Sequence, residues 1–197
     1  ISTDGIVTLV GQPSSHGVMS DDGELIVLTM NDEGGGYNLL VLMRAHYCPV
    51  HRFWSHTLSR HFYTTGEAEK QKLIDTYSNV WTYEDVAYSA MADDGEPNSV
   101  PVHRFWSDAL SAHFYTSDEA EKQKLIDRYP RVWTYEGIAF YAFPAGLQPS
   151  DASAVHRFWS NTLSCHFYTM SEQERDKLIN NYSDVWIYEG IAWYALP

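Results

Sequence analysis

Residues 102–116 read VHRFWSDALSAHFYT, and nearly the same words occur at residues 50–64 (VHRFWSHTLSRHFYT) and at residues 155–169 (VHRFWSNTLSCHFYT). Each copy is followed by a short charged stretch and then by VWTYE or VWIYE. The opening histidines and the later tryptophans both recur at steps of 52 and then 53 residues, which indicates duplication. These markers are His51, His103, His156, Trp81, Trp133 and Trp186.

The chain has 197 residues, of which 44% are hydrophobic and 20% charged, a composition that allows an ordinary folded core. Aromatic residues make up 15% of the chain and are concentrated inside the copies. We expect a β-rich segment at residues 1–48 and a three-repeat domain at residues 49–197. The repeats span about residues 50–92, 102–144 and 155–197.

Charge restricts the partners. The 13 basic residues are outnumbered by 26 acidic ones, which gives a formal charge of −13 at pH 7. Nucleic acids and anionic membranes attract proteins largely through phosphate neutralisation, so we expect no nucleic acid partner. No apolar run approaches the about 20 residues that span a bilayer, and we expect no membrane insertion. The N-terminus lacks the pattern of a signal peptide, so the chain is expected to be a processed secreted form or a protein made without a signal.

The first 48 residues differ in character from the repeats. The apolar runs GIVTLV, ELIVLTM and NLLVLMR predict strands, and QPSSHG, SDDG and NDEGGG have the chemistry of turns. Unpaired strand edges here would favour self-association, so a homodimer is among the expected assemblies. Cys48 and Cys165 are too few for a disulfide framework, and the sequence leaves open whether they pair.

Within a copy, HRFWS and HFYT predict two strands joined by a tight connection, because both are rich in aromatic residues and a short polar segment separates them. A threonine followed three residues later by glutamate then predicts a capping box that begins a helix of about three turns. We expect Leu73, Ile74 and Tyr77 to form the inward stripe of the first helix, and Pro130 to end the second helix. The same stripe is expected in the other two helices, at Leu125, Ile126 and Tyr129 and at Leu178, Ile179 and Tyr182. The capping threonines are Thr64, Thr116 and Thr169.

VWTYEGIAFYA predicts a longer strand after the helix, where Gly137 and Gly190 allow a bend and the first copy has Asp85. Such a unit cannot bury its aromatic face alone. The expected fold class is mainly β with one short helix per repeat, and three pseudo-symmetric repeats that close in a β-trefoil-like assembly. An open array of repeats is the alternative.

The blocks HRFWS, HFYT and VWTYEGIAFYA resemble a short aromatic repeat family of unknown function. That family occurs in bacterial and fungal proteins, which are often secreted and often carry hydrolases or lectin-like modules. The resemblance covers about residues 50–197, leaves out the first 48 residues, and implies a non-catalytic accessory or lectin-like role. The first copy departs from the pattern at Asp85 and at VAYSAM, where the other copies read IAFYAF and IAWYAL.

Two interpretations fit the polar residues that recur among the aromatic ones. In the structural one, an arginine pairs with a glutamate of its own copy and the histidines bond to the backbone, because a buried charge must be paired. The expected pairs are Arg52 with Glu84, Arg104 with Glu136 and Arg157 with Glu189.

The functional interpretation is a sugar site in each copy, where an aromatic ring stacks on a pyranose and polar groups bind its hydroxyls. Stacking candidates are Trp54, Trp106 and Trp159 with Tyr63, Tyr115 and Tyr168, although large aromatic residues also dominate cores. The predicted sugar-binding residues of the two regular copies are His103, Arg104, Trp106, His113, Tyr115, Glu136, His156, Arg157, Trp159, His166, Tyr168 and Glu189.

Catalysis needs one asymmetric constellation, whereas the reactive residue types here come in triplicate without a GxSxG, HExxH or phosphate-loop motif. We therefore expect no enzyme and no cofactor. His51, His56 and His61 could gather around a metal, but Asp108 and Asn161 replace His56 in the other copies, and no metal site is expected.

The sequence thus favours a non-enzymatic, lectin-like protein whose partner is carbohydrate on glycoproteins or polysaccharides. Weak repeated sites suit a repetitive ligand, because linked sites raise avidity. A structural or protein-interaction module, or an inhibitor or defence protein, is the alternative.

Overall fold

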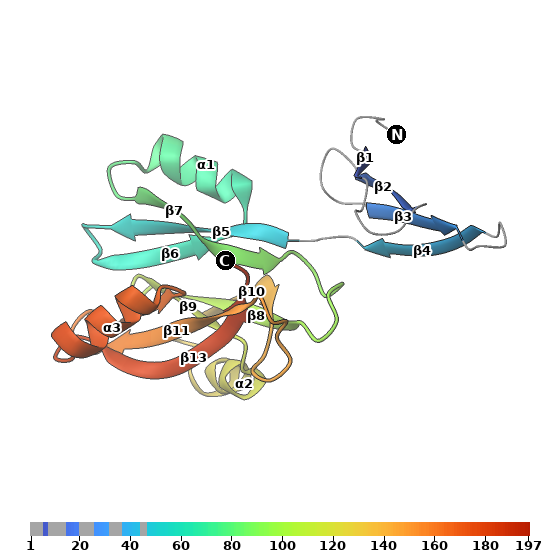
Figure 1. Ribbon diagram of the computed structural model, residues 1–197. Coiled ribbons are helices and arrows are strands. Elements are labelled where there is room, and N and C mark those ends of the chain that lie inside the picture. Colours follow the sequence, from blue (N-terminus) through green and yellow to red (C-terminus); the bar gives the residue numbers. More distant parts are fainter. Residues whose placement is uncertain (1–5, 8–14, 20–25, 32–36, 44–46) are drawn as a thin grey trace. The chain divides into compact units, whose positions relative to one another are not determined.

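The computed structural model describes residues 6–7, 15–19, 26–31, 37–43 and 47–197, and the chain divides into two compact units, Ile1–His46 and Tyr47–Pro197 (Figure 1). In the first unit four strands pair antiparallel in the order β1-β2-β3-β4. Part of the expected turn QPSSHG lies in strand β2, whereas SDDG and most of NDEGGG lie outside the described residues. The strands are β1 (Ile6–Val7), β2 (Ser15–Met19), β3 (Ile26–Asn31) and β4 (Tyr37–Met43).

In the second unit each repeat folds as a hairpin, a helix and a long strand, so the mainly β class with one short helix per repeat is confirmed. Repeat 1 contains β5 (Tyr47–Ser55), β6 (Arg60–Thr64), α1 (Glu67–Thr76) and β7 (Thr82–Met91). Repeat 2 contains β8 (Val100–Ser107), β9 (Ala112–Thr116), α2 (Glu119–Arg128) and β10 (Thr134–Ala142). Repeat 3 contains β11 (Ser153–Ser160), β12 (Cys165–Thr169), α3 (Glu172–Asn181) and β13 (Ile187–Ala195).

Alternation along the first strand of each hairpin separates core from surface. In β8, Phe105 and Ser107 are buried while Arg104 and Trp106 are half-buried on the other face. The hairpin turn closes because the Ser107 hydroxyl accepts from the amide of Leu110 at 3.2 Å. Each repeat therefore presents an arginine and a tryptophan on the outer face of its sheet.

The long strands connect the repeats. β7 and β10 pair at Met91 and Tyr141, which joins repeats 1 and 2 in a six-stranded sheet, and repeat 3 forms a three-stranded sheet. Isolated bridges join Phe143 to Tyr194 and Ser89 to Leu196. All three repeats are thus linked at the ends of their long strands, but the sheets of the described residues show neither a closed barrel nor the expected trefoil symmetry.

Three buried tyrosines, one from each hairpin, bond to one another in a ring. The Tyr63 hydroxyl donates to the carbonyl of Tyr168 at 2.7 Å, that of Tyr168 to Tyr115 at 2.7 Å, and that of Tyr115 to Tyr63 at 2.6 Å. Each hydroxyl also accepts from the backbone amide of the tyrosine to whose carbonyl it donates, at 3.0 to 3.3 Å. The rings meet edge to face with centroids 5.7 to 5.8 Å apart.

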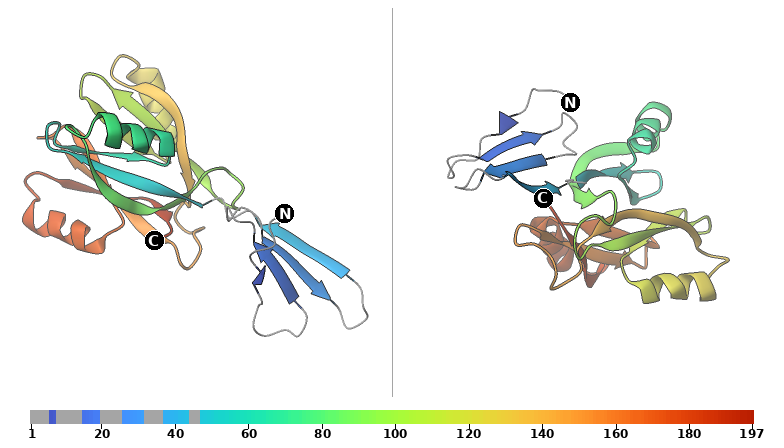
Figure 2. Two further views of the ribbon diagram at one scale, coloured as in Figure 1. Left: turned by 90° about the horizontal axis from the view of Figure 1, so that it is seen from above. Right: turned by 90° about the vertical axis from the view of Figure 1, so that its right-hand side faces the viewer.

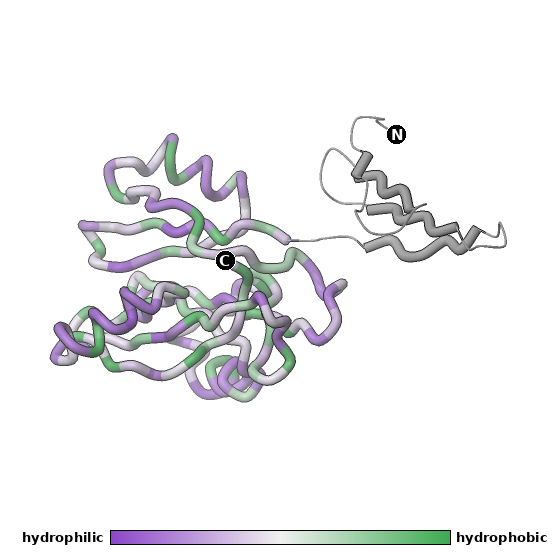
Figure 3. The backbone as a smooth tube through the Cα atoms, in the orientation of Figure 1, coloured by the Kyte–Doolittle hydropathy of each residue, from purple (hydrophilic) through white to green (hydrophobic). Residues whose placement is uncertain are grey.

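The helices lie on the periphery of this unit in both views of Figure 2, and hydrophilic residues cover much of α1 and α3 in Figure 3. None of the three contains a buried residue, so the expected inward stripe is wrong: Ile74 is 36% and Tyr77 42% exposed. The capping box is also wrong, because each helix begins two residues after the predicted start. The N-caps are Gly66, Asp118 and Ser171.

The expected bend in the long strand is present. Gly137 and Gly190 have φ of 104° and 106°, and the strand register shifts beside both. Asp85 takes the same conformation in repeat 1, with φ of 108°, so its side chain occupies a position that favours glycine. No helix in the described ranges is long and apolar enough to span a membrane. Cys48 and Cys165 are both free thiols.

Candidate functional site at the repeat junctions

Neighbouring repeats meet through an arginine that contacts two glutamates. At the second junction, between repeats 2 and 3, Nε of Arg157 lies 2.9 Å from Glu189 of β13 and Nη1 lies 2.8 Å from Glu121 of α2. The same contacts surround Arg104 at the first junction, between repeats 1 and 2, and Arg52 at the third, between repeats 3 and 1. The expected pairs within each copy are confirmed, and a second glutamate from the neighbouring helix is added.

A histidine completes this polar group. Nε2 of His166 lies 3.4 Å from Glu189, and the equivalent distances for His113 and His61 are 3.3 and 3.2 Å. Burial tends to raise the pKa of Glu189, but the hydrogen bond from His166 and the charge of Arg157 hold it below the usual value. These histidines therefore contact side chains, where the structural interpretation expected the backbone.

Four aromatic rings form a continuous row across each junction, which we call the aromatic row. At the second junction, Trp133 packs on Phe114 with centroids 5.8 Å apart, Phe114 on His166 at 4.6 Å, and His166 on Trp159 at 4.7 Å. Half of the row comes from repeat 2 and half from repeat 3. The other rows are Trp81, Phe62, His113, Trp106 and Trp186, Phe167, His61, Trp54.

The aromatic row of the second junction lines an open groove with a volume of about 360 Å³. Polar groups from both repeats reach the groove. It is lined by Leu110, Phe114, Glu121, Lys124, Leu125, Tyr129, Trp133, Trp159, His166 and Glu189.

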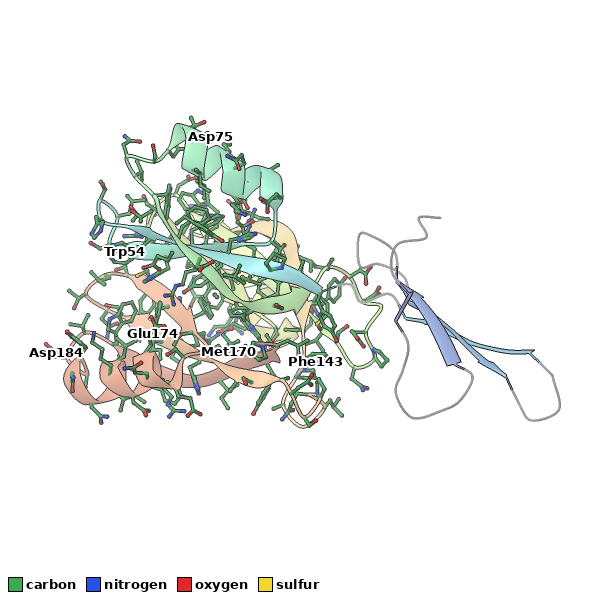
Figure 4. All side chains as sticks on the ribbon, turned by 45° about the horizontal axis from the view of Figure 1, so that its top comes forward. Trp54, Asp75, Phe143, Met170, Glu174 and Asp184 are labelled. Atoms are coloured by element: carbon green, nitrogen blue, oxygen red, sulfur yellow. The ribbon has the colours of Figure 1, made fainter. Side chains whose placement is uncertain are left out.

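A smaller groove of about 240 Å³ lies at the third junction. Figure 4 labels Trp54 of β5 and Glu174 of α3, which belong to the two repeats that meet there. The residues lining this groove come from repeat 3 and match those that repeat 2 supplies to the second groove. They are Phe167, Glu174, Lys177, Leu178, Tyr182 and Trp186.

The residue types that line the second groove recur at the equivalent positions of all three copies, from Leu58, Leu110 and Leu163 to Glu84, Glu136 and Glu189. Elsewhere on the helix the copies differ: Arg128 of α2 corresponds to Thr76 and Asn181. Tyr129 recurs in every copy although 45% of it is exposed, and burial in the core does not explain that.

The predicted sugar-binding residues separate into two groups. Trp159, His166 and Glu189 line the second groove, and Trp106, His113 and Glu136 make the equivalent ring and carboxylate contacts at the first junction. Arg104 and Arg157 bridge the glutamates of their junctions.

The other four predicted sugar-binding residues are buried, and the prediction is corrected for them. Tyr115 and Tyr168 are each 1% exposed within the tyrosine ring, so neither can stack on a sugar. His103 and His156 are also buried, with Nδ1 2.9 Å from the hydroxyls of Tyr135 and Tyr188.

Sequence reasoning missed the half of the groove that the preceding repeat supplies. Lys124, Tyr129 and Trp133 line it, but Tyr129 had been assigned to the helix's inward stripe and Trp133 served only as a repeat marker. The repetition of exposed Tyr77, Tyr129 and Tyr182 was the available signal. In the part of the chain that the structure describes, no group of three or more His, Cys, Asp or Glu is placed to hold a metal ion.

Fold and junctions together define a mainly β, aromatic-rich repeat protein with grooves between its repeats. The chain belongs to the family described as Domain of unknown function (DUF5648), which matches residues 24–143 and again residues 49–196. The first match begins inside the segment that the sequence resemblance left out, and the two matches end at equivalent positions of repeats 2 and 3. Searches of curated proteins and of solved structures found no match.

Proposed function

We propose that this protein is a non-catalytic, lectin-like glycan-binding protein whose sugar sites are the junction grooves rather than surfaces inside single repeats. The observation that carries the proposal is the second groove: an open hollow lined by five aromatic rings and by carboxylates, whose lining residue types recur in all three copies. Its volume of about 360 Å³ falls in the range of small-molecule sites, about 300 to 1,000 Å³.

The chemistry of the groove suits a neutral sugar. Trp133 and Trp159 offer ring faces to the apolar side of a pyranose, and the carboxylates of Glu121 and Glu189 accept hydrogen bonds from hydroxyls. Arg157 balances part of that negative charge, and Lys124 supplies a further cation at the groove. Groups of both signs leave little net charge to attract an anionic or a cationic ligand.

We also propose that the three repeats form a closed, β-trefoil-like assembly with pseudo-threefold symmetry. Support comes from contacts that run in a cycle: Arg52 to Glu174, Arg104 to Glu69 and Arg157 to Glu121. The tyrosine ring and the bridges between the long strands follow the same cyclic order. In such an assembly the three junctions would lie around one axis and bind a repetitive glycan with avidity.

A broad glycan array with the intact protein tests the function, with free monosaccharides as competitors. We expect binding to a related set of glycans that one sugar displaces. The Trp133→Ala and Trp159→Ala variants should each weaken binding at the second groove by about tenfold, because truncating a central stacking ring removes a dominant contact. Tyr47→Ala, an exposed aromatic outside the groove, is the matched control. A blank array with folded protein, or unchanged binding by both tryptophan variants, would contradict the proposal.

A further inference from the structure

One tryptophan of each aromatic row comes from a hairpin, and we call it the groove tryptophan after Trp159, which lines the second groove. It is Trp106 at the first junction, Trp159 at the second and Trp54 at the third. The three junctions differ at the residue two positions after this tryptophan. Nε1 of Trp159 donates to Oδ1 of Asn161 at 2.7 Å, and Nε1 of Trp106 donates to Oδ1 of Asp108 at 2.7 Å. At the third junction the equivalent residue is His56, whose ring meets the Trp54 indole edge-on, with centroids 5.7 Å apart and planes at 85°.

The surroundings of the tryptophan are otherwise the same. Trp54 and Trp159 each lie 4.7 Å from the histidine of their aromatic row, at 47° and 46°. His61 and His166 each lie 4.6 Å from the phenylalanine of the preceding repeat. The third junction therefore has the same ring contacts as the second and differs from it locally, at residue 56. His56, Asp108 and Asn161 are all exposed, so none is needed for the core.

This difference changes what the indole can do. The indole N–H is the only hydrogen-bond donor of a tryptophan side chain. In Trp106 and Trp159 an adjacent oxygen uses that donor and fixes the plane of the ring. His56 brings no carboxylate or amide oxygen to Trp54, and among the described residues the N–H of Trp54 donates to no partner, which leaves it available to a hydroxyl of a bound sugar.

The grooves at the second and third junctions also differ, in their lining and in their volume. The second groove is lined by residues of both repeats, including Trp159, and has a volume of about 360 Å³. The third has about 240 Å³ and is lined by repeat 3 alone. A sugar at the third junction would thus meet a smaller hollow. Trp54 does not line that hollow, but it belongs to the aromatic row that continues through His61 to Phe167 in its lining.

We propose that the residue two positions after the groove tryptophan determines specificity, so that the third junction binds a neutral sugar differently from the first and second. This inference rests on the proposed glycan-binding function. Asn161 and Asp108 give two similar sites, and His56 gives a divergent one. The chain then carries two kinds of site in a single set of three.

Indole N–H exchange with solvent, measured by ¹⁵N NMR on the intact protein, tests the first step without any ligand. We expect the Trp54 signal to exchange about three- to tenfold faster than those of Trp106 and Trp159, the factor corresponding to one net hydrogen bond. His56→Asn should slow Trp54, and Asn161→His should speed Trp159. Equal N–H exchange rates at the three tryptophans, or rates that the two substitutions leave unchanged, would overturn the inference.

The same signals are then followed during titration with D-glucose, D-galactose, D-mannose and N-acetyl-D-glucosamine. We expect Trp106 and Trp159 to shift together and Trp54 to report a Kd about three- to tenfold different, or a different preferred sugar. His56→Asn should remove that difference. If all three tryptophans report one common Kd and His56→Asn does not alter it, the inference is overturned and the proposed function still stands. No shift at any groove tryptophan with any of the four sugars overturns both.

Discussion

At the scale of single residues, the ring of Tyr63, Tyr115 and Tyr168 shows how polar groups can stabilise a core. Each buried hydroxyl donates to a carbonyl of one repeat and accepts from the amide of the same residue. Burial raises the pKa of all three phenols well above the usual value. The hydroxyls therefore stay protonated and hold the repeats together at neutral pH.

Tyr115→Phe should lower the free energy of unfolding by about 1 to 3 kcal/mol, because the substitution leaves a buried amide and a buried carbonyl of Tyr63 without their partner. Urea unfolding followed by circular dichroism measures the change. Tyr129→Phe removes a hydroxyl from an exposed tyrosine and serves as the control. Equal stability of the two variants would show that the ring of hydrogen bonds does not stabilise the core.

Stability should also depend on His103. Burial lowers the pKa of this imidazole, and the charge of Lys122 lowers it further, while Glu119 opposes the shift. A histidine whose pKa is lower in the folded chain leaves stability intact above its unfolded pKa of about 6.5, and stability falls as the pH drops below that value. We expect His103→Gln to weaken this pH dependence in urea titrations, while His56→Gln, at an exposed position, leaves it unchanged. Identical pH profiles for all three proteins would contradict this role of burial.

At the scale of elements, the strands could be predicted because their aromatic and β-branched patterns are local. The helix start could not be located as well, since Thr64, Thr116 and Thr169 are each followed within two residues by the true N-cap. Thr116 accepts instead from the amide of Asp118, and the Asp118 carboxylate caps α2 by accepting from Ala120 and Glu121. Two capping residues in succession cannot be ranked from spacing alone.

Asp85 in β7 offers a test of backbone strain. Its φ of 108° is unfavourable for any residue with a side chain, whereas Gly137 and Gly190 take the same conformation without that cost. Asp85→Gly should raise the free energy of unfolding by about 1 kcal/mol, after the loss of the bond from the Val86 amide to the carboxylate is included. The measurement is thermal or urea unfolding.

The reverse exchange is the matched control for that prediction. Gly137→Asp should destabilise the protein by about 1 to 3 kcal/mol. A Cβ added at Gly137 meets no atom within 4 Å, so only the backbone conformation can account for the effect. If Asp85→Gly destabilised the protein instead, the hydrogen bond of the Asp85 carboxylate would stabilise the fold by more than the backbone strain at this residue costs.

At the scale of the whole molecule, the residue types of the groove could be read from the sequence but their partners could not. Trp159, His166 and Glu189 were expected to form a site with their own copy. Instead they face Phe114, Glu121 and Trp133 of the preceding repeat. Repetition reveals which residues a unit uses, whereas contacts between units depend on how the units pack, and identical copies give no pattern that identifies the neighbour.

Repeat 3 should be required for cooperative folding of the other two. Without it, Arg52 loses Glu174, and two of the three bonded tyrosines lose their partner Tyr168. We expect a chain that ends after residue 144 to unfold in urea without a sharp transition and to lack fixed aromatic signals in near-UV circular dichroism. The full chain is the control. A shortened monomer that unfolds as cooperatively as the full chain would contradict the cyclic dependence.

The central claim is that a sugar binds between repeats, and a crystal structure of the protein soaked with the sugar that best competes on the glycan array tests it most directly. The account predicts electron density for the sugar in the second groove, against Trp133 of repeat 2 and Trp159 of repeat 3. Density for the sugar confined to the surface of a single repeat, with the grooves occupied only by solvent, would contradict it.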